Sequence, residues 1–406
     1  MSRAGLDGID TLLLEVGPGL TRIALRRDGA LIDLIVEAAG HESRIGWILL
    51  GRVIEVSHGL DAAFVDIGAA EPGFLPARAA RLLKPEMPAG TPIARLLAEG
   101  ETHLLQQVKD ESAGKGSVLS ADIALHSDHL VLTPRLAGVA VSRAIAGKAE
   151  RARLRRAALD AAQALGLPPQ EGIVLRTAAA GLDAATIQAE LAALAARWRA
   201  IQARAAPAKP PVVIDRPAGA LEQLLPHLAP DTDILCADLA GHTRVTRWCE
   251  AHRPELLPHI VRYRGQDPLF EREGVEEEIA AALERSVPLP GGGALAIDPV
   301  EALVAIDVNG AERDPREAAF AAVHEVARQI RLRSLSGLIL VDFPRLDRRA
   351  DRDRLIEELR AALAGDRVNT QLLGYTRGGL VEIIRPRDRD TLAHQLAHQL
   401  AQLRAG

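Results

Sequence analysis

The chain has 406 residues, of which 48% are hydrophobic and 25% are charged, and its formal net charge at pH 7 is −5. This composition is typical of a soluble globular protein with more than one domain, and it excludes an overall basic coat. The two cysteines, Cys236 and Cys249, are too few for a disulfide framework and lack zinc-finger spacing. No apolar stretch is long enough to span a membrane and no signal-peptide pattern opens the chain, so we expect a cytoplasmic protein without a membrane span.

Residues 9–37 predict three successive strands. Runs rich in Leu, Ile and Val fill this range, and turn sequences interrupt it at Gly17-Pro18-Gly19 and at Asp28-Gly29. Strands that follow one another through such short turns pair as neighbours, so the sequence predicts a β-meander.

Residues 43–122 predict a small barrel of the OB type, because several short strands are separated by glycine turns. Phe64 and Phe74 stand out, since the chain has only five phenylalanines. In an OB barrel, exposed aromatic rings stack on the bases of a single strand over a basic groove, and Lys115 would add a phosphate contact. The alternative is that both rings are ordinary core residues.

A predicted strand at residues 172–177 ends in Arg176 and Thr177. Arginine binds two phosphate oxygens at once and a hydroxyl can add a further hydrogen bond, so the pair suits a terminal phosphate. An ordinary surface pair is the alternative reading, and the residues alone favour it.

The remaining patterns predict helices and a linker. The Pro-rich stretch 205–211 predicts a linker, and residues 212–285 return to alternating strands and helices. A last helix, 388–405, carries His394 and His398 one turn apart. Two such histidines can bind a metal, but nothing nearby completes a site, so a solvated or partner-facing helix is the better interpretation. The earlier helical ranges are 150–165, 184–203 and 275–283.

Two apolar runs in the last third of the chain each contain an aspartate near their C-terminal end. Residues 302–309 deliver Asp307 and residues 337–343 deliver Asp342, and each run has the composition of a strand buried on both faces. Between them, Asp314-Pro315 begins a helix whose apolar residues recur at three- and four-residue steps. A strand–helix–strand unit makes the two strands parallel, so both aspartates should emerge at the same edge of the sheet.

Two carboxylates at one edge repel each other unless a cation lies between them. Mg²⁺ is held by one or two carboxylates together with substrate phosphate oxygens, so Asp307 and Asp342 are candidate metal ligands. Asn309 adds a third polar group at this edge. The alternative is that each aspartate only caps a helix or forms a turn, and the residues alone leave both interpretations open.

Several segments, in the same order along nearly the whole chain, resemble the catalytic region of the ribonuclease E/G family of bacterial endoribonucleases. The most specific is residues 290–309, which contain Pro-Gly-Gly-Gly and the run that ends in Asp307 and Asn309. The next is residues 330–343, which end in the second aspartate and a phenylalanine. The other similar segments are residues 61–76, 174–178, 267–270 and 376–382.

The resemblance implies a multidomain architecture of the α+β and α/β classes. An RNase H-like fold is split by an insertion that holds an OB-type RNA-binding barrel and a 5′-phosphate sensor, and a DNase I-like catalytic subdomain follows. The implied ranges are 1–42 and 212–285 for the RNase H-like fold, 43–122 for the barrel, 123–211 for the sensor region, 286–387 for the DNase I-like subdomain and 388–406 for the C-terminal helix.

The resemblance also implies a role for each matching residue. Asp307 and Asp342 correspond to the Mg²⁺-binding aspartates, and Asn309 corresponds to the asparagine that assists in that site. The RNA-gripping residues of the barrel correspond to Phe64, Phe74 and Lys115. The 5′-phosphate pocket corresponds to Arg176, Thr177 and Arg377, with a contribution from Arg143.

The chain also departs from the family pattern. The zinc-binding cysteine pair that joins family protomers has no counterpart, so a homodimer would not be linked by zinc. The loop after Asn309 is shorter, and Arg345 stands where the family more often has an acidic residue near the metal. The second arginine expected after Arg143 is missing, which would relax the sensor.

Together these features predict a Mg²⁺-dependent endoribonuclease that cleaves single-stranded, A/U-rich RNA and favours 5′-monophosphorylated ends. Its expected targets are rRNA precursors and mRNA. The alternative is a catalytically weak or inactive RNA-binding paralogue, which Arg345 and the shortened loop favour. A nucleotide-binding α/β enzyme is a poorer reading, because no Gly-rich phosphate loop opens a helix.

Overall fold

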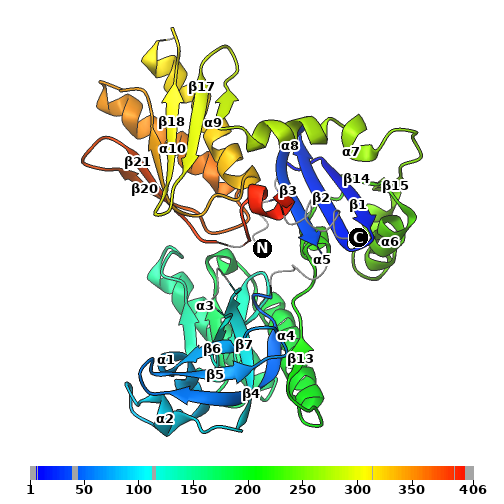
Figure 1. Ribbon diagram of the computed structural model, residues 1–406, viewed down its shortest axis with the longest axis vertical. Helices are drawn as coiled ribbons and strands as arrows, with labels where there is room; N and C mark the ends of the chain where they lie inside the picture. The colour runs from blue at the N-terminus through cyan, green and yellow to red at the C-terminus, as the bar shows by residue number, and fades with distance from the viewer. Residues whose placement is uncertain are drawn as a thin grey trace. The chain divides into compact units, whose positions relative to one another are not determined.

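The computed structural model describes residues 6, 8–38, 44–111, 116–312, 314–387 and 389–397 (Figure 1). The protein is of the mixed α+β class. It divides into two compact units, a larger one of residues 1–42 with 218–406 and a smaller one of residues 43–217. Each unit contains two sheets with their own hydrophobic clusters. Within the described ranges, no helix is long and apolar enough to cross a membrane.

The first sheet of the larger unit has five strands and helices on both faces. Its elements are β1 Thr11–Gly17, β2 Leu20–Arg27, β3 Ala30–Ala38, α5 Ala220–Leu224, η4 Leu225–His227, β14 Asp233–Cys236, α6 Leu239–His252, η5 Pro254–His259, β15 Ile260–Arg262, α7 Leu269–Arg272 and α8 Val275–Leu283. The strand order is β15-β14-β1-β2-β3, with β14 and β15 parallel to β1. The predicted β-meander is confirmed as β1, β2 and β3. One cluster packs under α5 and α6 and another under α7 and α8.

A closed barrel of five strands forms the first part of the smaller unit. Its elements are β4 Ile48–Ser57, β5 Ala62–Asp66, β6 Gly73–Pro76, α1 Ala77–Ala80, η2 Arg81–Leu83, α2 Ile93–Leu96, β7 Thr102–Lys109 and β8 Val118–Ser120. The strands pair in the order β4-β5-β6-β8-β7, and β7 pairs with β4 to close the ring. This arrangement is consistent with the OB-like domain that the short strands and glycine turns predict.

The second part of the smaller unit is a four-stranded sheet packed against two long helices. Its elements are β9 Leu125–His126, β10 Leu130–Thr133, β11 Val139–Val141, α3 Lys148–Ala164, β12 Gly172–Leu175, η3 Thr177–Ala179 and α4 Ala184–Ala205. The strand order is β11-β12-β10-β9. Both helices begin and end within two residues of the predicted ranges. They close a core that includes Leu154, Leu191 and Trp198.

The two ends of the smaller unit lie side by side. Strand β13, Val212–Asp215, follows the predicted linker and pairs antiparallel with the start of β4. Trp47, just before β4, has the guanidinium groups of Arg44 and Arg216 over its ring, at 5.4 and 4.2 Å from the centroid. Such cation–π contacts are attractive, so the segments by which the chain enters and leaves this unit are fastened to each other.

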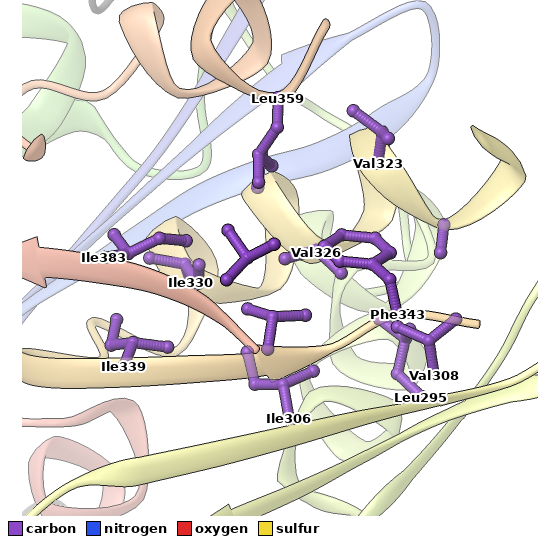
Figure 2. Packing of buried hydrophobic residues seen from close by; sticks show 14 of the residues in the cluster. Leu295, Ile306, Val308, Val323, Val326, Ile330, Ile339, Phe343, Leu359 and Ile383 are labelled. Carbon is purple, nitrogen blue, oxygen red and sulfur yellow. The ribbon is translucent and has the colours of Figure 1, made fainter. Parts of the chain in front are cut away.

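The last sheet of the larger unit packs its helices against one face. Its elements are β16 Ser286–Pro288, β17 Ala294–Pro299, β18 Val304–Asn309, α9 Pro315–Leu332, β19 Gly337–Asp342, α10 Arg349–Ala364, β20 Gln371–Tyr375 and β21 Val381–Arg385. The strand order is β16-β17-β18-β19-β21-β20, and β18 runs parallel to β19. Figure 2 shows Val326 and Ile330 of α9 packed onto Ile306 of the sheet, with Leu359 of α10 in the same cluster.

The prediction that β18 and β19 are buried on both faces is wrong. Buried and exposed residues alternate strictly along Val304–Asn309, and Asp342 at the end of β19 is also exposed. One face packs on the helices and the other is open. Ala305 and Leu340 lie on the open face, and these apolar residues lengthen the hydrophobic runs so that they imitate doubly covered strands.

A buried cluster of charges lies between β3 and the end of α9. Asp33 is fully buried and accepts hydrogen bonds from Arg331, at 3.1 Å, and from Arg389, while Arg367 forms an ion pair with it at 3.7 Å. Burial alone would raise the pKa of Asp33, but Arg367, Arg389 and Arg331 outweigh burial and hold the pKa well below its usual range. A second buried carboxylate, Asp366, accepts two hydrogen bonds from a buried arginine of β21, at 2.6 and 3.1 Å.

The described part of the predicted C-terminal helix packs on its own chain. Residues 392–397 are helical, Leu392 is buried among residues of the first sheet, and Gln395 accepts a hydrogen bond from the amide of Val36 at 3.3 Å. The expectation of a solvated or partner-facing helix therefore needs correction for this turn. His394 is exposed, and His398 lies outside the described residues.

Candidate functional site

The βαβ unit of β18, α9 and β19 forms as predicted. The Asp314 carboxylate accepts a hydrogen bond from the amide of Arg316 at 2.9 Å, and Pro315 occupies the first turn of α9. The strands are parallel, and Asp307 and Asp342 are direct register partners. The prediction that both aspartates emerge side by side at one edge of the sheet is confirmed.

Packing on the helix-covered face fixes the direction of both carboxylates. Ile306 and Val308 flank Asp307 and are buried in the core, and Val341 is buried directly before Asp342. Alternate residues of a strand point to opposite faces, so both aspartates project from the open face. Neighbouring strands lie about 4.8 Å apart, which holds two like charges close together.

Within the described part of the chain, neither Asp307 nor Asp342 has a hydrogen-bond or ion-pair partner for its carboxylate. The same residues include no group of three or more His, Cys, Asp or Glu side chains placed to hold a metal. Mg²⁺ needs no such group, because one or two carboxylates hold it while waters and substrate oxygens complete its shell. The pair therefore fits a hard divalent cation whose remaining ligands come from a substrate.

Asn309 lies two residues beyond Asp307 on the same open face. Its Oδ1 accepts a hydrogen bond from the amide of Ala311 at 2.9 Å, which orients the side chain. Gly293 lies against this strand end with φ +88°, and a Cβ there would come within 2.4 Å of the Asn309 carbonyl oxygen. A glycine is thus required where the turn before β17 approaches the site.

Sequence reasoning missed an ion pair next to the aspartates. Arg285 donates two hydrogen bonds to Asp298, with Nε–Oδ1 at 2.5 Å and Nη2–Oδ2 at 2.6 Å. Asp298 shares the open face, because Ala296 is the register partner of Asp307 and Asp298 lies two residues further along β17. The signal that could have found it is a charged residue next to the buried Ile297 in an otherwise apolar strand.

Arg345 does not form an ion pair with the site aspartates. Its side chain is 92% exposed, and its ion pair is with Asp347 at 3.5 Å. The predicted weakening of the metal site by Arg345 therefore has no direct contact to support it.

Phe64 and Phe74 lie together on the barrel. They are register partners on β5 and β6, and their rings meet edge to face with centroids 5.9 Å apart and planes at 65°. Both are half-buried, which fits neither a fully exposed platform nor a pure core role. Lys115, the third predicted barrel residue, lies outside the described residues.

Main-chain acceptors hold Arg176 in place at the end of β12. Its Nη1 donates to the carbonyl oxygens of Ser127 and Asp128, at 3.1 and 3.2 Å. Burial lowers the pKa of the neighbouring His126, and the positive charge of Arg176 lowers it further. His126 therefore adds no competing positive charge near Arg176 at neutral pH.

Thr177 shares a hydrogen bond with Ser142, with their hydroxyl oxygens 2.8 Å apart. Arg143 follows Ser142 directly and is exposed, so the structure brings three of the predicted sensor residues to one end of this sheet. Sequence reasoning missed the contact of Ser142. Arg377, the fourth predicted residue, is exposed in the turn between β20 and β21 of the larger unit.

Comparison with known proteins identifies the family. Residues 124–388 match the model of the Ribonuclease E/G family. Ribonuclease G of Escherichia coli (strain K12) is 33% identical over 409 residues, which cover 96% of this chain and 82% of that protein. Ribonuclease G of Haemophilus influenzae is 32% identical over 414 residues, covering 97% of this chain and 82% of that protein. Ribonuclease E of Escherichia coli (strain K12) is 34% identical over 400 residues, covering 93% of this chain and 37% of that protein.

The matched relatives make the chain a hydrolase of the ribonuclease class. The family match spans more than half of the chain, and relatives more than 30% identical extend over nearly all of it. The chain belongs to the ribonuclease E/G family of endoribonucleases.

Proposed function

We propose that this protein is a Mg²⁺-dependent endoribonuclease that cleaves single-stranded RNA, with Asp307 and Asp342 as the metal ligands. The observation that carries the proposal is the exposed pair of neighbouring carboxylates with no described counter-charge in ion-pair range. Two like charges held together repel each other, and a bound cation relieves that repulsion. Bound Mg²⁺ would neutralise the scissile phosphate and make a bound water more acidic.

The residues around the pair orient the RNA. Rigid strand ends hold Asp307 and Asp342, so both carboxylates meet the substrate in a fixed geometry. The Oδ1 of Asn309 is occupied by the amide of Ala311, which leaves the Nδ2 group to donate a hydrogen bond to a phosphate oxygen.

The barrel is proposed to grip the single strand through Phe64 and Phe74, with Lys115 as a phosphate contact. Ring–base stacking contributes about 1–3 kcal/mol per base, so Phe64→Leu or Phe74→Leu should weaken RNA binding about 5- to 150-fold. Leucine keeps the apolar packing, so the melting temperature should change little. A lower melting temperature with unchanged RNA binding would show that the rings only pack the barrel.

The second sheet of the smaller unit is proposed to bind a 5′-monophosphate through Arg143, Arg176 and Thr177. Arg176 suits this role because, among the residues that the structure describes, carbonyl oxygens engage its Nη1 alone, and its other donors can form charge-assisted hydrogen bonds with a terminal phosphate.

The RNase H-like and DNase I-like assignments are also proposals. They are supported by the order of the first sheet, in which three antiparallel strands are followed by two parallel ones, and by the βαβ unit of the last sheet. We propose rRNA precursors and mRNA as targets, a cytoplasmic location, and, if protomers associate, a homodimer not linked by zinc.

A 3′-labelled single-stranded RNA, offered with a 5′-monophosphate or a 5′-hydroxyl, tests the proposal in Mg²⁺ and in EDTA. We expect internal cleavage that requires Mg²⁺, prefers the monophosphate, and falls by roughly 1,000-fold in Asp307→Asn and Asp342→Asn, since several kcal/mol of transition-state stabilisation are lost. Tight RNA binding without cleavage at any Mg²⁺ concentration would instead establish the catalytically inactive RNA-binding paralogue.

A further inference from the structure

The ion pair between Arg285 and Asp298 lies on the open face of the last sheet, and folding gives little reason for it. The side chains are 68% and 41% exposed. An ion pair this open to solvent contributes little to stability, even with two well-formed hydrogen bonds.

The pair lies beside the proposed metal ligands. Asp298 is two residues along β17 from Ala296, the register partner of Asp307. The amide of Ile297 donates to the carbonyl oxygen of Arg285 at 2.9 Å, which fixes Arg285 beside β17. Hydrogen bonding to Asp298 raises the pKa of Arg285 and the Asp307 carboxylate raises it further, so the guanidinium is within electrostatic reach of Asp307.

The open face around Asp307 is acidic. Asp298 and Asp342 share it, and Glu382 of β21 joins them as the register partner of Leu340. An RNA backbone that crosses this face therefore meets several like charges. A metal between the two site aspartates offsets this repulsion only for the phosphate that it binds, so the adjoining phosphate needs a cation from the protein.

We propose that Arg285 binds a phosphate of the RNA backbone next to the metal site, exchanging the Asp298 carboxylate for that phosphate. The inference rests on the proposed nuclease function. A guanidinium binds carboxylate and phosphate with the same planar, two-pronged geometry, so Asp298 holds Arg285 in the conformation in which it meets RNA. Without RNA, the Arg285 guanidinium then stays paired with Asp298.

A purely structural pair that fastens Arg285 to β17 leads to a different result. In that case Arg285→Gln and Asp298→Asn lower the melting temperature and the RNA affinity together. If Arg285 binds RNA, the two substitutions diverge. Loss of Arg285 removes a phosphate contact, whereas loss of the Asp298 charge releases the guanidinium for the phosphate.

The test measures binding of a labelled single-stranded RNA in EDTA, where cleavage is absent, across a series of KCl concentrations. We expect Arg285→Gln to lower the affinity about tenfold at low salt and to reduce the slope of log K against log salt by about 0.7, the value for one contact to a single strand. Arg285→Lys should keep the slope. Asp298→Asn should bind as tightly as the wild type or more tightly.

Arg360→Gln provides the matched control, because Arg360 forms a comparably exposed pair with Glu357 on α10, on the helix-covered side of the same sheet. Equal affinities and slopes for Arg285→Gln and Arg360→Gln would overturn the inference. A parallel loss of affinity in Asp298→Asn would overturn it as well. Failure of the nuclease proposal gives a separate result: the wild type fails to cleave RNA in Mg²⁺ while Arg285→Gln still lowers the slope.

Discussion

Two sets of carboxylates in the larger unit have opposite surroundings. Asp33 and Asp366 are buried, and arginine side chains bind both of them. Asp307 and Asp342 are exposed neighbours without a described counter-charge in ion-pair range. The chain has 49 basic residues, so this bare pair does not reflect a shortage of cations.

The difference separates charges that hold the fold from the charges that we propose bind a cation. A buried carboxylate needs its arginine, because an uncompensated charge in the interior costs several kcal/mol. An exposed pair is screened by water and salt, so the chain can leave it without a partner at modest cost. Because no arginine neutralises the two carboxylates, no ion pair within the described chain competes with a cation for them.

The largest expected effect comes from removing a buried charge. Asp33→Asn takes away the anion shared by Arg331, Arg367 and Arg389 and should lower the free energy of unfolding by about 3–5 kcal/mol. Urea denaturation followed by circular dichroism measures this. Asp307→Asn is the control, and it should leave stability unchanged or slightly raised because it relieves repulsion. Equal losses in the two variants would contradict the comparison.

Acid should destabilise the fold by protonating the buried set, Asp33 and Asp366. Burial tends to raise the pKa values of Asp33 and Asp366, but their arginines hold both below the ordinary value of 3.8. The unfolded chain therefore binds more protons, so this stability is complete above about pH 4 and is lost as pH falls toward the depressed values. Denaturation midpoints from neutral pH down to pH 3 should fall steeply in the wild type and less steeply in Asp33→Asn. Identical profiles would show that Asp33 does not contribute.

A cation should stabilise the exposed set alone. At a Mg²⁺ concentration of about ten times its dissociation constant, binding to the folded state adds about 1.4 kcal/mol. The melting temperature of the wild type should therefore rise with Mg²⁺ and return on addition of EDTA, whereas Asp342→Asn should show little response. A response of equal size in that variant would place the bound ion elsewhere.

The smallest effect comes from supplying the missing counter-charge. Ala305 is exposed on the open face of β18, two residues before Asp307. The register partner of Ala305 on β17 is Asp298, and Asp342 lies diagonally across on β19. Ala305→Arg should therefore raise the unfolding free energy by a few tenths of a kcal/mol and reduce the Mg²⁺ response. Ala305→Gln controls for side-chain size. If Ala305→Arg keeps the full Mg²⁺ response even together with Asp298→Asn, which removes its register partner's charge, the bare pair is not the cation site.

Much of the fold could be predicted from local sequence patterns. The meander, the two alanine-rich helices, helix α8 and the βαβ unit each follow from periodicity, turn residues or an Asp-Pro cap that acts over a few residues. Burial on both faces was predicted wrongly, because an open strand face with Ala305 and Leu340 reads like a covered one. The position of the C-terminal turn was predicted wrongly, because the turn packs against β3, which lies more than 350 residues earlier in the sequence.

The site was predictable where strand direction alone places a residue. Parallel pairing brings Asp307 and Asp342 together whatever the rest of the molecule does. Arg285 could not be found in this way, because it meets Asp298 across a hairpin whose register the sequence does not state. Likewise, the contact of Ser142 with Thr177 joins two segments separated by a whole helix.

The cation–π contacts of Arg44 and Arg216 with Trp47 have a consequence for how such a protein can evolve. Because β13 returns beside the start of β4, the smaller unit begins and ends at one place. A segment with adjoining ends can be gained, lost or exchanged in one genetic event without rerouting the strands of its host. The unit of residues 43–217 thus has the adjoining ends of an inserted domain. Its sequence can change in evolution while the sheet that carries Asp307 stays the same.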